Sequence, residues 1–423
     1  MTDTPRHPDR AYEARLVSVL TVTFGLAFFD RNAINQLMPY LVPALKLSNT
    51  QVGLLSSALS ISWAVSGYLV GSLSDRTARH KAILLLSVLV FSLCSFLSGQ
   101  AGTYGALLLA RMLMGVSEGP LLPVSQSLVA MEVEPARRGV TMGVLQTFGA
   151  NLLGNFAAPL VIVAMASAFG WRMAFNLAGV PGLVMVVIMA LVLRAPSRAA
   201  PAPATDTAAA NNSGSFRQLI GNRNILICLC ISVMMVAWMT IVWTFLPLYY
   251  VQVAGVSPRT MSILMALFGI SGMAVGFVVP KLSDRLGRRR LVFGATVLGG
   301  CIPLGALLTH SPVALGACAL LGWTASGGFS LFMATVPTES VSRHLTTRAM
   351  ALVMGAGEVL GGFSGPALAG LAADATDLRA PLYILLVLSS LASAAALLLT
   401  ETAPSQTAPV RRRQDAAPGF PAG

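Results

Sequence analysis

Apolar residues occur in long runs along this chain of 423 residues, and short polar or charged stretches separate the runs. Most runs are long enough for a helix to cross the roughly 30 Å hydrocarbon core of a bilayer, which takes about 20 residues. The pattern therefore predicts twelve membrane-spanning helices. They are expected at residues 16–41, 51–73, 82–99, 103–130, 139–167, 172–193, 225–254, 258–280, 291–309, 313–339, 347–373 and 380–400.

One polar interval is much longer than the others and divides the predicted helices into two sets of six. It is rich in Ala, Pro, Ser and Asn, a composition typical of a flexible linker. We expect an N-terminal segment, a six-helix bundle, the linker, a second six-helix bundle and a disordered tail. These parts cover residues 1–15, 16–193, 194–224, 225–400 and 401–423.

Composition supports this interpretation. The chain is 55% hydrophobic and 10% charged, whereas soluble proteins carry roughly 25% charged residues. A soluble fold of this length would need more polar surface than the chain provides. We therefore predict an all-α integral membrane protein in the lipid bilayer.

The net charge of +12 follows the predicted topology instead of indicating nucleic-acid binding. Of the 28 Lys and Arg residues, 22 lie at the two termini and in one alternating set of predicted loops. The opposite loops hold Lys46, Arg172, Arg259 and Arg379. This asymmetry predicts that both termini face the cytoplasm, in a multi-pass protein of a bacterial inner membrane. Because this distribution accounts for nearly all of the positive charge, no nucleic-acid partner is expected.

Neither metal nor cofactor is expected. The five cysteines all lie in apolar runs without metal-type spacing, which is typical of small core residues. There is also no phosphate-binding loop and no nucleophile constellation, so an enzyme is not expected. The polar N-terminus carries no cleavable signal pattern, so the first span is expected to be retained.

Five ionisable residues lie well inside predicted spans: Asp30, Arg31, Arg111, Glu118 and Glu358. A charge at the bilayer centre costs about 2.5–3.5 kcal/mol on insertion scales, so such residues normally face the protein interior and have a partner or a task. Arg111 and Glu118 are seven residues apart and share one helix face. Asp30 and Arg31 are adjacent, so one can face the fourth helix while the other faces a central cavity.

These residue types could couple anion binding to proton binding. Arginine offers a planar, permanently charged fork to a carboxylate, sulfonate or phosphate. Burial disfavours the ionised form of a carboxyl group, which can then bind and release a proton near neutral pH. Asp30 and Glu118 would then couple to protons, and Arg31 and Arg111 would bind the substrate. The alternative is an ion-pair network that only holds the first and fourth helices together.

Glu358 allows three interpretations: a second protonation site, a group that binds a hydroxyl or an amine, or a neutral acid with a local hydrogen bond. Asn151 and Asn155 share a face of the fifth helix, where they could bind the substrate or join helices by hydrogen bonds. Trp238 in the seventh helix is a further candidate for the wall of the substrate site.

Two similar segments begin at residues 71 and 280: GSLSDRTARHK and PKLSDRLGRRR. Each follows the second predicted helix of its half, which indicates two related six-helix bundles, an architecture found in transporters. The first segment resembles the loop signature of the major facilitator superfamily. The resemblance implies a conformational lock on the cytoplasmic side, in which Asp75 can meet a helix N-terminus and Arg137 or Arg138. The expected lock residues are Gly71, Asp75, Arg76, Arg79, Asp284 and Arg285.

The D-R pair at residues 30–31, the R-x-x-x-G-x-x-E-G-P segment at 111–120 and GWRMAF at 170–175 resemble one branch of this superfamily, the anion:cation symporters. The resemblance implies that Asp30 and Glu118 match proton-coupling acids, and that Arg31 and Arg111 match the basic residues of an anion site.

These observations favour a secondary transporter that takes up a small organic anion, a carboxylate or sulfonate, together with protons by alternating access. We expect a monomer that uses a proton gradient instead of a cofactor. The competing hypothesis is proton-driven efflux of an organic acid or a drug-like metabolite. The fifth helix reads GANLLGNFAAP and lacks the G-P-x-x-G-G motif of such antiporters, and paired arginines suit an anion.

Overall fold

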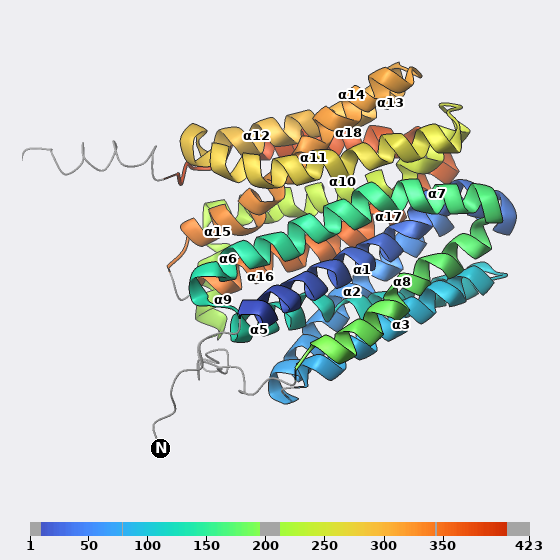
Figure 1. Ribbon diagram of the computed structural model, residues 1–423. Helices are drawn as coiled ribbons and strands as arrows, with labels where there is room; N and C mark the ends of the chain where they lie inside the picture. The colour runs from blue at the N-terminus through green and yellow to red at the C-terminus, as the bar shows by residue number, and fades with distance from the viewer. Residues whose placement is uncertain (1–9, 78, 195–211, 343–344, 404–423) are drawn as a thin grey trace, which may run out of the picture.

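The computed structural model describes residues 10–77, 79–194, 212–342 and 345–403, and these residues form helices without strands. In Figure 1 the helices run side by side along one direction. The helices of the first half, residues 10–194, are α1 Arg10–Leu45, α2 Asn49–Thr77, α3 His80–Gln100, α4 Tyr104–Glu118, α5 Leu121–Glu132, α6 Pro135–Gly143, η1 Val144–Ala157, α7 Ala158–Phe169 and α8 Trp171–Val192.

The second half, residues 212–403, continues the same architecture. Its helices are α9 Asn212–Ile220, α10 Arg223–Gln252, α11 Pro258–Leu286, α12 Arg288–Gly299, α13 Cys301–Leu308, α14 Pro312–Gly322, η2 Trp323–Gly328, η3 Leu331–Thr335, α15 Val336–Glu339, α16 Thr346–Ala356, η5 Gly357–Gly362, α17 Phe363–Ala375 and α18 Ala380–Ala396.

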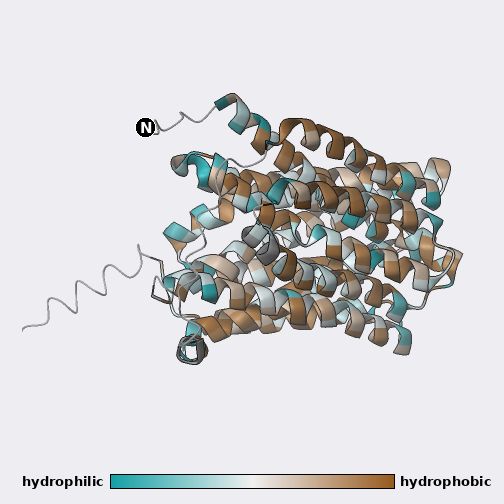
Figure 2. Cartoon of the chain, turned by 90° about the horizontal axis from the view of Figure 1, so that it is seen from below, coloured by the Kyte–Doolittle hydropathy of each residue, from teal (hydrophilic) through white to brown (hydrophobic). Residues whose placement is uncertain are grey.

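Eleven helical segments of the described chain are long and apolar enough to cross a membrane. The twelfth predicted span contains a shorter apolar helix, Ala380–Ala396. Hydrophobic residues dominate the middle of the bundle and hydrophilic ones gather mostly toward its two ends (Figure 2). The predicted all-helical membrane architecture is therefore confirmed, with span limits within a few residues of those predicted.

Several spans are built from more than one helical segment. Gly119 and Pro120 separate α4 from α5, because a proline removes a backbone donor and disrupts the helix before it. η1 and η5 are π-helical, a rare geometry that is frequent at functional sites. These two segments carry Asn151, Asn155 and Glu358, three of the predicted substrate-binding residues.

The described parts of the predicted linker and tail are more regular than expected. Residues 195–211 and 404–423 lie outside the described residues. The linker also contains α9, whose Leu219 is buried in the apolar core. Glu401, at the start of the predicted tail, accepts hydrogen bonds from the backbone amides of Arg288 and Arg289 at the start of α12. Burial of one leucine and one helix cap explain these two departures.

The described hydrogen bonds between the two halves run through α2, while α11 packs against η1 and α7. Four hydrogen bonds between the halves have both partners described, and all four involve residues of α2. The Asp374 carboxylate accepts from the backbone amides of Asn49 and Thr50, each at 2.8 Å. Ser57 Oγ donates to the Phe363 carbonyl at 2.6 Å. The fourth bond runs from Thr244 to Ser56.

These contacts lie away from the chain termini. The start of α1 and the red segment that follows α18 lie at one end of the bundle, called the terminal end here (Figure 1). Because α1 has 36 residues, it carries the chain about 54 Å to the opposite end, where α2 begins. There a Cβ placed on Gly53 would lie 2.1 Å from the Pro366 carbonyl oxygen, and one on Gly370 would lie 2.4 Å from that of Asn49. The backbones of α2 and α17 are therefore in close contact at the opposite end.

At the terminal end, each described ion pair joins two residues of the same half. Arg137 pairs with Glu13 at 2.9 Å and with Glu134 at 3.1 Å. Arg288 pairs with Asp284 at 2.6 Å and with Glu339 at 3.0 Å. The structure is thus a conformation whose halves are bonded to each other near the opposite end.

We expect Asp374→Asn to loosen the opposite end. Asn offers one acceptor oxygen without charge, whereas the Asp374 carboxylate binds two amides at the positive N-terminus of α2. Hydrogen bonds to charged groups contribute about 1.5–3 kcal/mol, so amide hydrogen exchange in residues 49–53 should accelerate by about tenfold or more. Asp377→Asn is the matched control, since Asp377 accepts from Arg379 within the same loop. Equal exchange in both variants would contradict this role of Asp374.

Candidate functional site

The centre of the first half holds an ion pair between α1 and α4. Arg31 Nε donates to Glu118 Oε2 at 2.8 Å, with 22% of the Arg31 side chain and 2% of the Glu118 side chain exposed. The Arg31 guanidinium also lies over two aromatic rings, 5.0 Å from the centroid of Phe28 and 5.3 Å from that of Trp63. Arg31 is thus held on three sides, and part of it remains accessible.

Arg111 lies behind this pair and is almost completely buried. Its Nη2 donates to the Arg31 carbonyl at 3.1 Å, and its Nη1 lies 3.2 Å from the Met114 sulfur. These contacts fix the backbone that carries Arg31. The predicted contact between Arg111 and substrate remains a prediction, because the described contacts give Arg111 a positioning role in this conformation.

Asp30 contacts α3. Its carboxylate accepts a hydrogen bond from Ser95 Oγ, and the side chain is buried. Asp30, Glu118 and Arg111 are close enough for their charges to interact. The structure thus brings the four ionisable residues of the first and fourth spans together. Arg31 contacts α4, and its side chain is the one of the four that is partly exposed. The Asp30 side chain lies between α1 and α3.

Two carboxyl oxygens of this cluster have no hydrogen-bond partner among the described residues. They are Asp30 Oδ2 and Glu118 Oε1, both buried. An unsatisfied buried oxygen is costly when the group is ionised. A proton on either oxygen would relieve that cost, so the geometry suits groups that exchange protons.

Asn151 and Asn155 form a hydrogen-bonded chain that starts beside Arg31. Asn32 Nδ2 donates to Asn155 Oδ1 at 3.0 Å and to the Gly154 carbonyl at 3.0 Å. Asn155 Nδ2 donates to Asn151 Oδ1 at 2.9 Å. Asn155 therefore has a helix-joining hydrogen bond to α1, whereas both hydrogen bonds of Asn151 stay within η1, to Asn155 and to the Thr147 carbonyl. Binding of substrate by the two residues stays a prediction.

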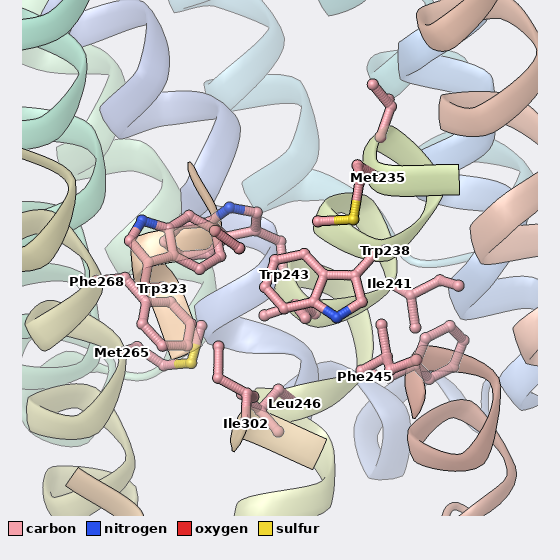
Figure 3. Packing of buried hydrophobic residues seen from close by; sticks show 14 of the residues in the cluster. Met235, Trp238, Ile241, Trp243, Phe245, Leu246, Met265, Phe268, Ile302 and Trp323 are labelled. Carbon is pink, nitrogen blue, oxygen red and sulfur yellow. The ribbon is translucent and has the colours of Figure 1, made fainter. Parts of the chain in front are cut away.

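Trp238 belongs to an aromatic cluster of the second half, formed with Trp243, Trp323 and Phe268. Figure 3 shows these rings packed among Met235, Met265 and Ile302. The Phe268 and Trp323 rings are stacked, with centroids 4.4 Å apart, and the centroids of Trp238 and Trp323 are 5.9 Å apart. Trp238 is completely buried, so its predicted place in the wall of the substrate site stays a prediction.

Glu358 lies on η5 and is half-buried. Its Oε2 and Ser60 Oγ of α2 lie 3.6 and 3.4 Å from the point where a Cβ on Gly362 would stand. Glu358 and Arg31 are also close enough for their charges to interact. The structure therefore places Glu358 beside Ser60 of α2, within electrostatic range of Arg31.

The two lock segments are helical instead of forming loops. The first copy up to Thr77 belongs to the last turns of α2, and the second copy up to Leu286 ends α11. The side chains of Gly71, Asp75 and Arg76 lie outside the described residues, so the predicted pairing of Asp75 stays a prediction. Arg79 is exposed just before α3, and Arg285 is exposed at the end of α11.

Asp284 pairs with Arg288, one turn further along the second lock segment. The position of Arg288 corresponds to that of Arg79 in the first segment. Arg288 also reaches Glu339 at the end of α15. The second segment therefore ties together three helices of its own half.

The contributors to the site that were not predicted include Asn32, Ser95 and Trp63. Asn32 had a signal in the sequence, since it follows the D-R pair directly and is polar within an apolar run. Ser95 and Trp63 had none, because a serine or a tryptophan in a membrane span is common in packing and gains its role here from the facing helix.

An apolar groove of about 320 Å³ lies between α2 and α4, away from this chemistry. It is lined by Ile61, Ser62, Val65, Ser66, Leu69, Val70 and Val116. None of the ionisable residues described above lines it, and apolar side chains on a membrane helix suit lipid contact. The site of interest is the polar cluster instead.

Small residues let α2 approach α4 next to the ion pair. A Cβ on Gly115 would lie 2.6 Å from the Leu59 carbonyl oxygen and 3.1 Å from the Trp63 amide nitrogen. A Cβ on Gly119 would lie 2.5 Å from the Trp63 carbonyl oxygen. This close approach places Trp63 against Arg31, as expected for glycines in a helix interface.

Comparison with known proteins agrees with this architecture. The family model described as Major Facilitator Superfamily matches residues 20–363 and 281–422. The chain is 29% identical to a hexuronate transporter of Bacillus subtilis over 305 residues, 70% of each chain. It is 26% identical to a probable sulfoacetate transporter of Cupriavidus necator over 325 residues, 72% of this chain and 74% of the relative.

A crystal structure of a bacterial homologue of the human lysosomal transporter Spinster, inward-facing and unoccupied, has a similar fold. Its TM-score is 0.78 with 19% identity, over 92% of this chain and 97% of that chain. At this identity the likeness shows the fold alone, and it confirms the predicted fold class.

We expect Gly115→Ala to destabilise the protein, because the added methyl group would overlap backbone atoms of α2. Overpacking of this kind costs about 1–3 kcal/mol, and the melting temperature in detergent should fall. Gly105→Ala in the same helix is the control, since no atom lies within 4 Å of its Cβ position. A melting temperature of Gly115→Ala equal to that of Gly105→Ala would contradict the tight α2–α4 contact.

Proposed function

Since this chain belongs to the major facilitator superfamily and is a membrane transporter, we propose that it takes up a small organic anion together with protons. The substrate would be a carboxylate or a sulfonate, and the membrane a bacterial inner membrane with both chain termini in the cytoplasm. The observation that carries the proposal is the bond between Arg31 and Glu118, in a cluster with two carboxyl oxygens that have no hydrogen-bond partner among the described residues.

The exchange of partners at Arg31 is the central step of the proposed mechanism. In the present conformation Glu118 occupies one edge of the guanidinium, through Nε at 2.8 Å. A proton on Glu118 would remove the charge that holds Arg31. The guanidinium could then offer its planar fork to the anion of the substrate. Binding of the anion and of a proton would thereby favour each other.

The surrounding residues hold Arg31 in position while its partner changes. Arg111 holds the Arg31 backbone at 3.1 Å, and Phe28 and Trp63 keep the guanidinium plane between two aromatic faces. Asp30, hydrogen-bonded to Ser95, supplies a second carboxyl that could exchange the proton with Glu118. The buried environment strengthens each of these electrostatic interactions because little water screens them.

Alternating access would provide the movement. The halves are bonded to each other near the opposite end, through α2 and Asp374. With the termini in the cytoplasm, this is the conformation closed to the outside. Release of the α2 contacts and formation of contacts at the terminal end would expose the site to the other face. The names of two relatives, a hexuronate and a sulfoacetate transporter, support an organic anion as the substrate.

The proposal is tested by uptake into proteoliposomes that contain the purified protein. Labelled gluconate, glucuronate, 4-hydroxybenzoate, sulfoacetate and nicotinate are offered with and without an inward proton gradient. We expect at least one acid to accumulate above equilibrium when the gradient is present, and a protonophore to abolish this accumulation. Accumulation driven by an acidic interior instead would indicate exchange of an acid for protons, as in efflux. Equal uptake with and without a gradient would refute proton coupling.

Glu118→Gln separates binding from coupling in the same assay. The amide keeps the shape of the side chain but cannot take up a proton, so accumulation should fall to the level without a gradient while counterflow exchange continues. Glu132→Gln, at the end of α5 in the same membrane span, should retain accumulation. Gradient-driven accumulation by Glu118→Gln would exclude Glu118 as the coupling acid.

Arg31→Lys should weaken binding of the transported acid by about tenfold or more, because an ammonium group lacks the planar fork. The matched control is Arg172→Lys, whose guanidinium lies 4.1 Å from the Trp171 ring centroid outside the site. Calorimetric titration of both variants and of the unmodified protein measures the effect. An unchanged dissociation constant in Arg31→Lys would remove Arg31 from the anion site.

A further inference from the structure

Glu358 is an intramembrane acid of the second half without a hydrogen bond among the described residues. Asp30 accepts from Ser95, and Glu118 accepts from Arg31. Glu358 is half-buried on the π-helical segment η5. A polar group at membrane depth is costly unless it has a partner, and such residues normally mark functional sites.

One face of α2 contacts both Glu358 and Arg31, through Ser60 and Trp63. Ser60 Oγ and Glu358 Oε2 lie near the same point beside Gly362, at 3.4 and 3.6 Å from its Cβ position. Trp63 follows Ser60 by three residues and so lies on the same face of α2. Its ring lies under the Arg31 guanidinium, 5.3 Å away. Both Arg31 and Glu358 keep accessible surface.

The two charged groups of this arrangement, Arg31 and Glu358, belong to different halves of the protein. Arg31 is on α1, whereas Glu358 is on η5. A molecule with an anionic end on Arg31 and a hydrogen-bond donor on Glu358 would contact both halves at once. The site would select such a ligand by its hydrogen-bond donor. An analogue without the donor would leave the Glu358 acceptor unpaired and would bind more weakly.

We propose that Glu358, with Ser60 beside it, binds a hydroxyl group of the substrate and makes the transporter selective for hydroxylated carboxylates. This inference rests on the proposed anion transport and adds a second substrate-binding group to the same site. Hydroxyl is favoured over a protonated amine by the position of Arg31, since the Arg31 charge reaches Glu358 and would repel a second cation there. The Ser60 hydroxyl can both donate to a substrate hydroxyl and accept from it.

The test compares acids that differ in their hydroxyl groups. The pairs are gluconate with hexanoate, 4-hydroxybenzoate with benzoate, and 3-hydroxybutyrate with butyrate; 6-aminohexanoate supplies the amine. Calorimetric titration of the purified protein measures binding, because the unsubstituted acids cross bilayers unaided. The proteins are the unmodified chain, Glu358→Gln, Glu358→Leu and the control Val359→Leu, which alters an exposed neighbour on η5.

The unmodified protein and Val359→Leu should bind the hydroxylated member of at least one pair about tenfold more tightly, the effect of one hydrogen bond to a charged group. Glu358→Leu should lose this preference while it still binds the unsubstituted acid, which shows that the variant is folded. Glu358→Gln, which keeps an acceptor oxygen, should retain part of the preference.

Other results would overturn the inference. An unchanged preference in Glu358→Leu would show that Glu358 does not contact the hydroxyl, and a preference for 6-aminohexanoate would assign it to an amine. A change confined to the pH dependence of binding in Glu358→Gln would make it a second proton site. If the unmodified protein bound none of these acids, the proposed anion transport would fail with it.

Discussion

The structure depends on how a chain with 10% charged residues places five ionisable groups inside a membrane-spanning bundle. Isolated charges at that depth would cost several kcal/mol each. Four of them, Asp30, Arg31, Arg111 and Glu118, form one cluster. Arg31 pairs with Glu118 at 2.8 Å, Arg111 donates to the Arg31 carbonyl and Asp30 accepts from Ser95. Because each group depends on the others, α1, α3 and α4 must keep a fixed mutual position.

Tight helix packing supports the cluster. Without a hydrophobic driving force between helices in lipid, close backbone contact supplies much of the association energy. Gly115 and Gly119 let α2 lie directly on α4, and this contact brings Trp63 against Arg31. The same helix α2 provides every described hydrogen bond between the halves. Arg31 therefore contacts, through Trp63, the helix that carries these hydrogen bonds between the halves.

The fold could be predicted from the sequence to a large extent. The hydropathy pattern located the eleven candidate membrane spans and the shorter apolar helix α18 of the described chain, because each apolar run must match the thickness of the bilayer whatever its neighbours are. The pattern could not show the breaks within spans, such as the π-helical segments η1 and η5, since these depend on contacts with facing helices. It also missed α9 and the cap from Glu401, because burial of Leu219 and a bond to α12 arise from distant parts of the chain.

The candidate site divides in the same way. The sequence by itself determined which residues are unusual, because a charged residue in an apolar run is visible without coordinates, and the seven-residue spacing put Arg111 and Glu118 on one face. Only the tertiary structure decided the roles. It bonded Asp30 to Ser95 of α3, Arg111 to the Arg31 carbonyl and Asn155 to Asn32, and it set Glu358 beside α2 within electrostatic range of Arg31. The reason is physical: a residue carries its own charge and helical phase, whereas its partner and its access to a ligand depend on the helices packed around it.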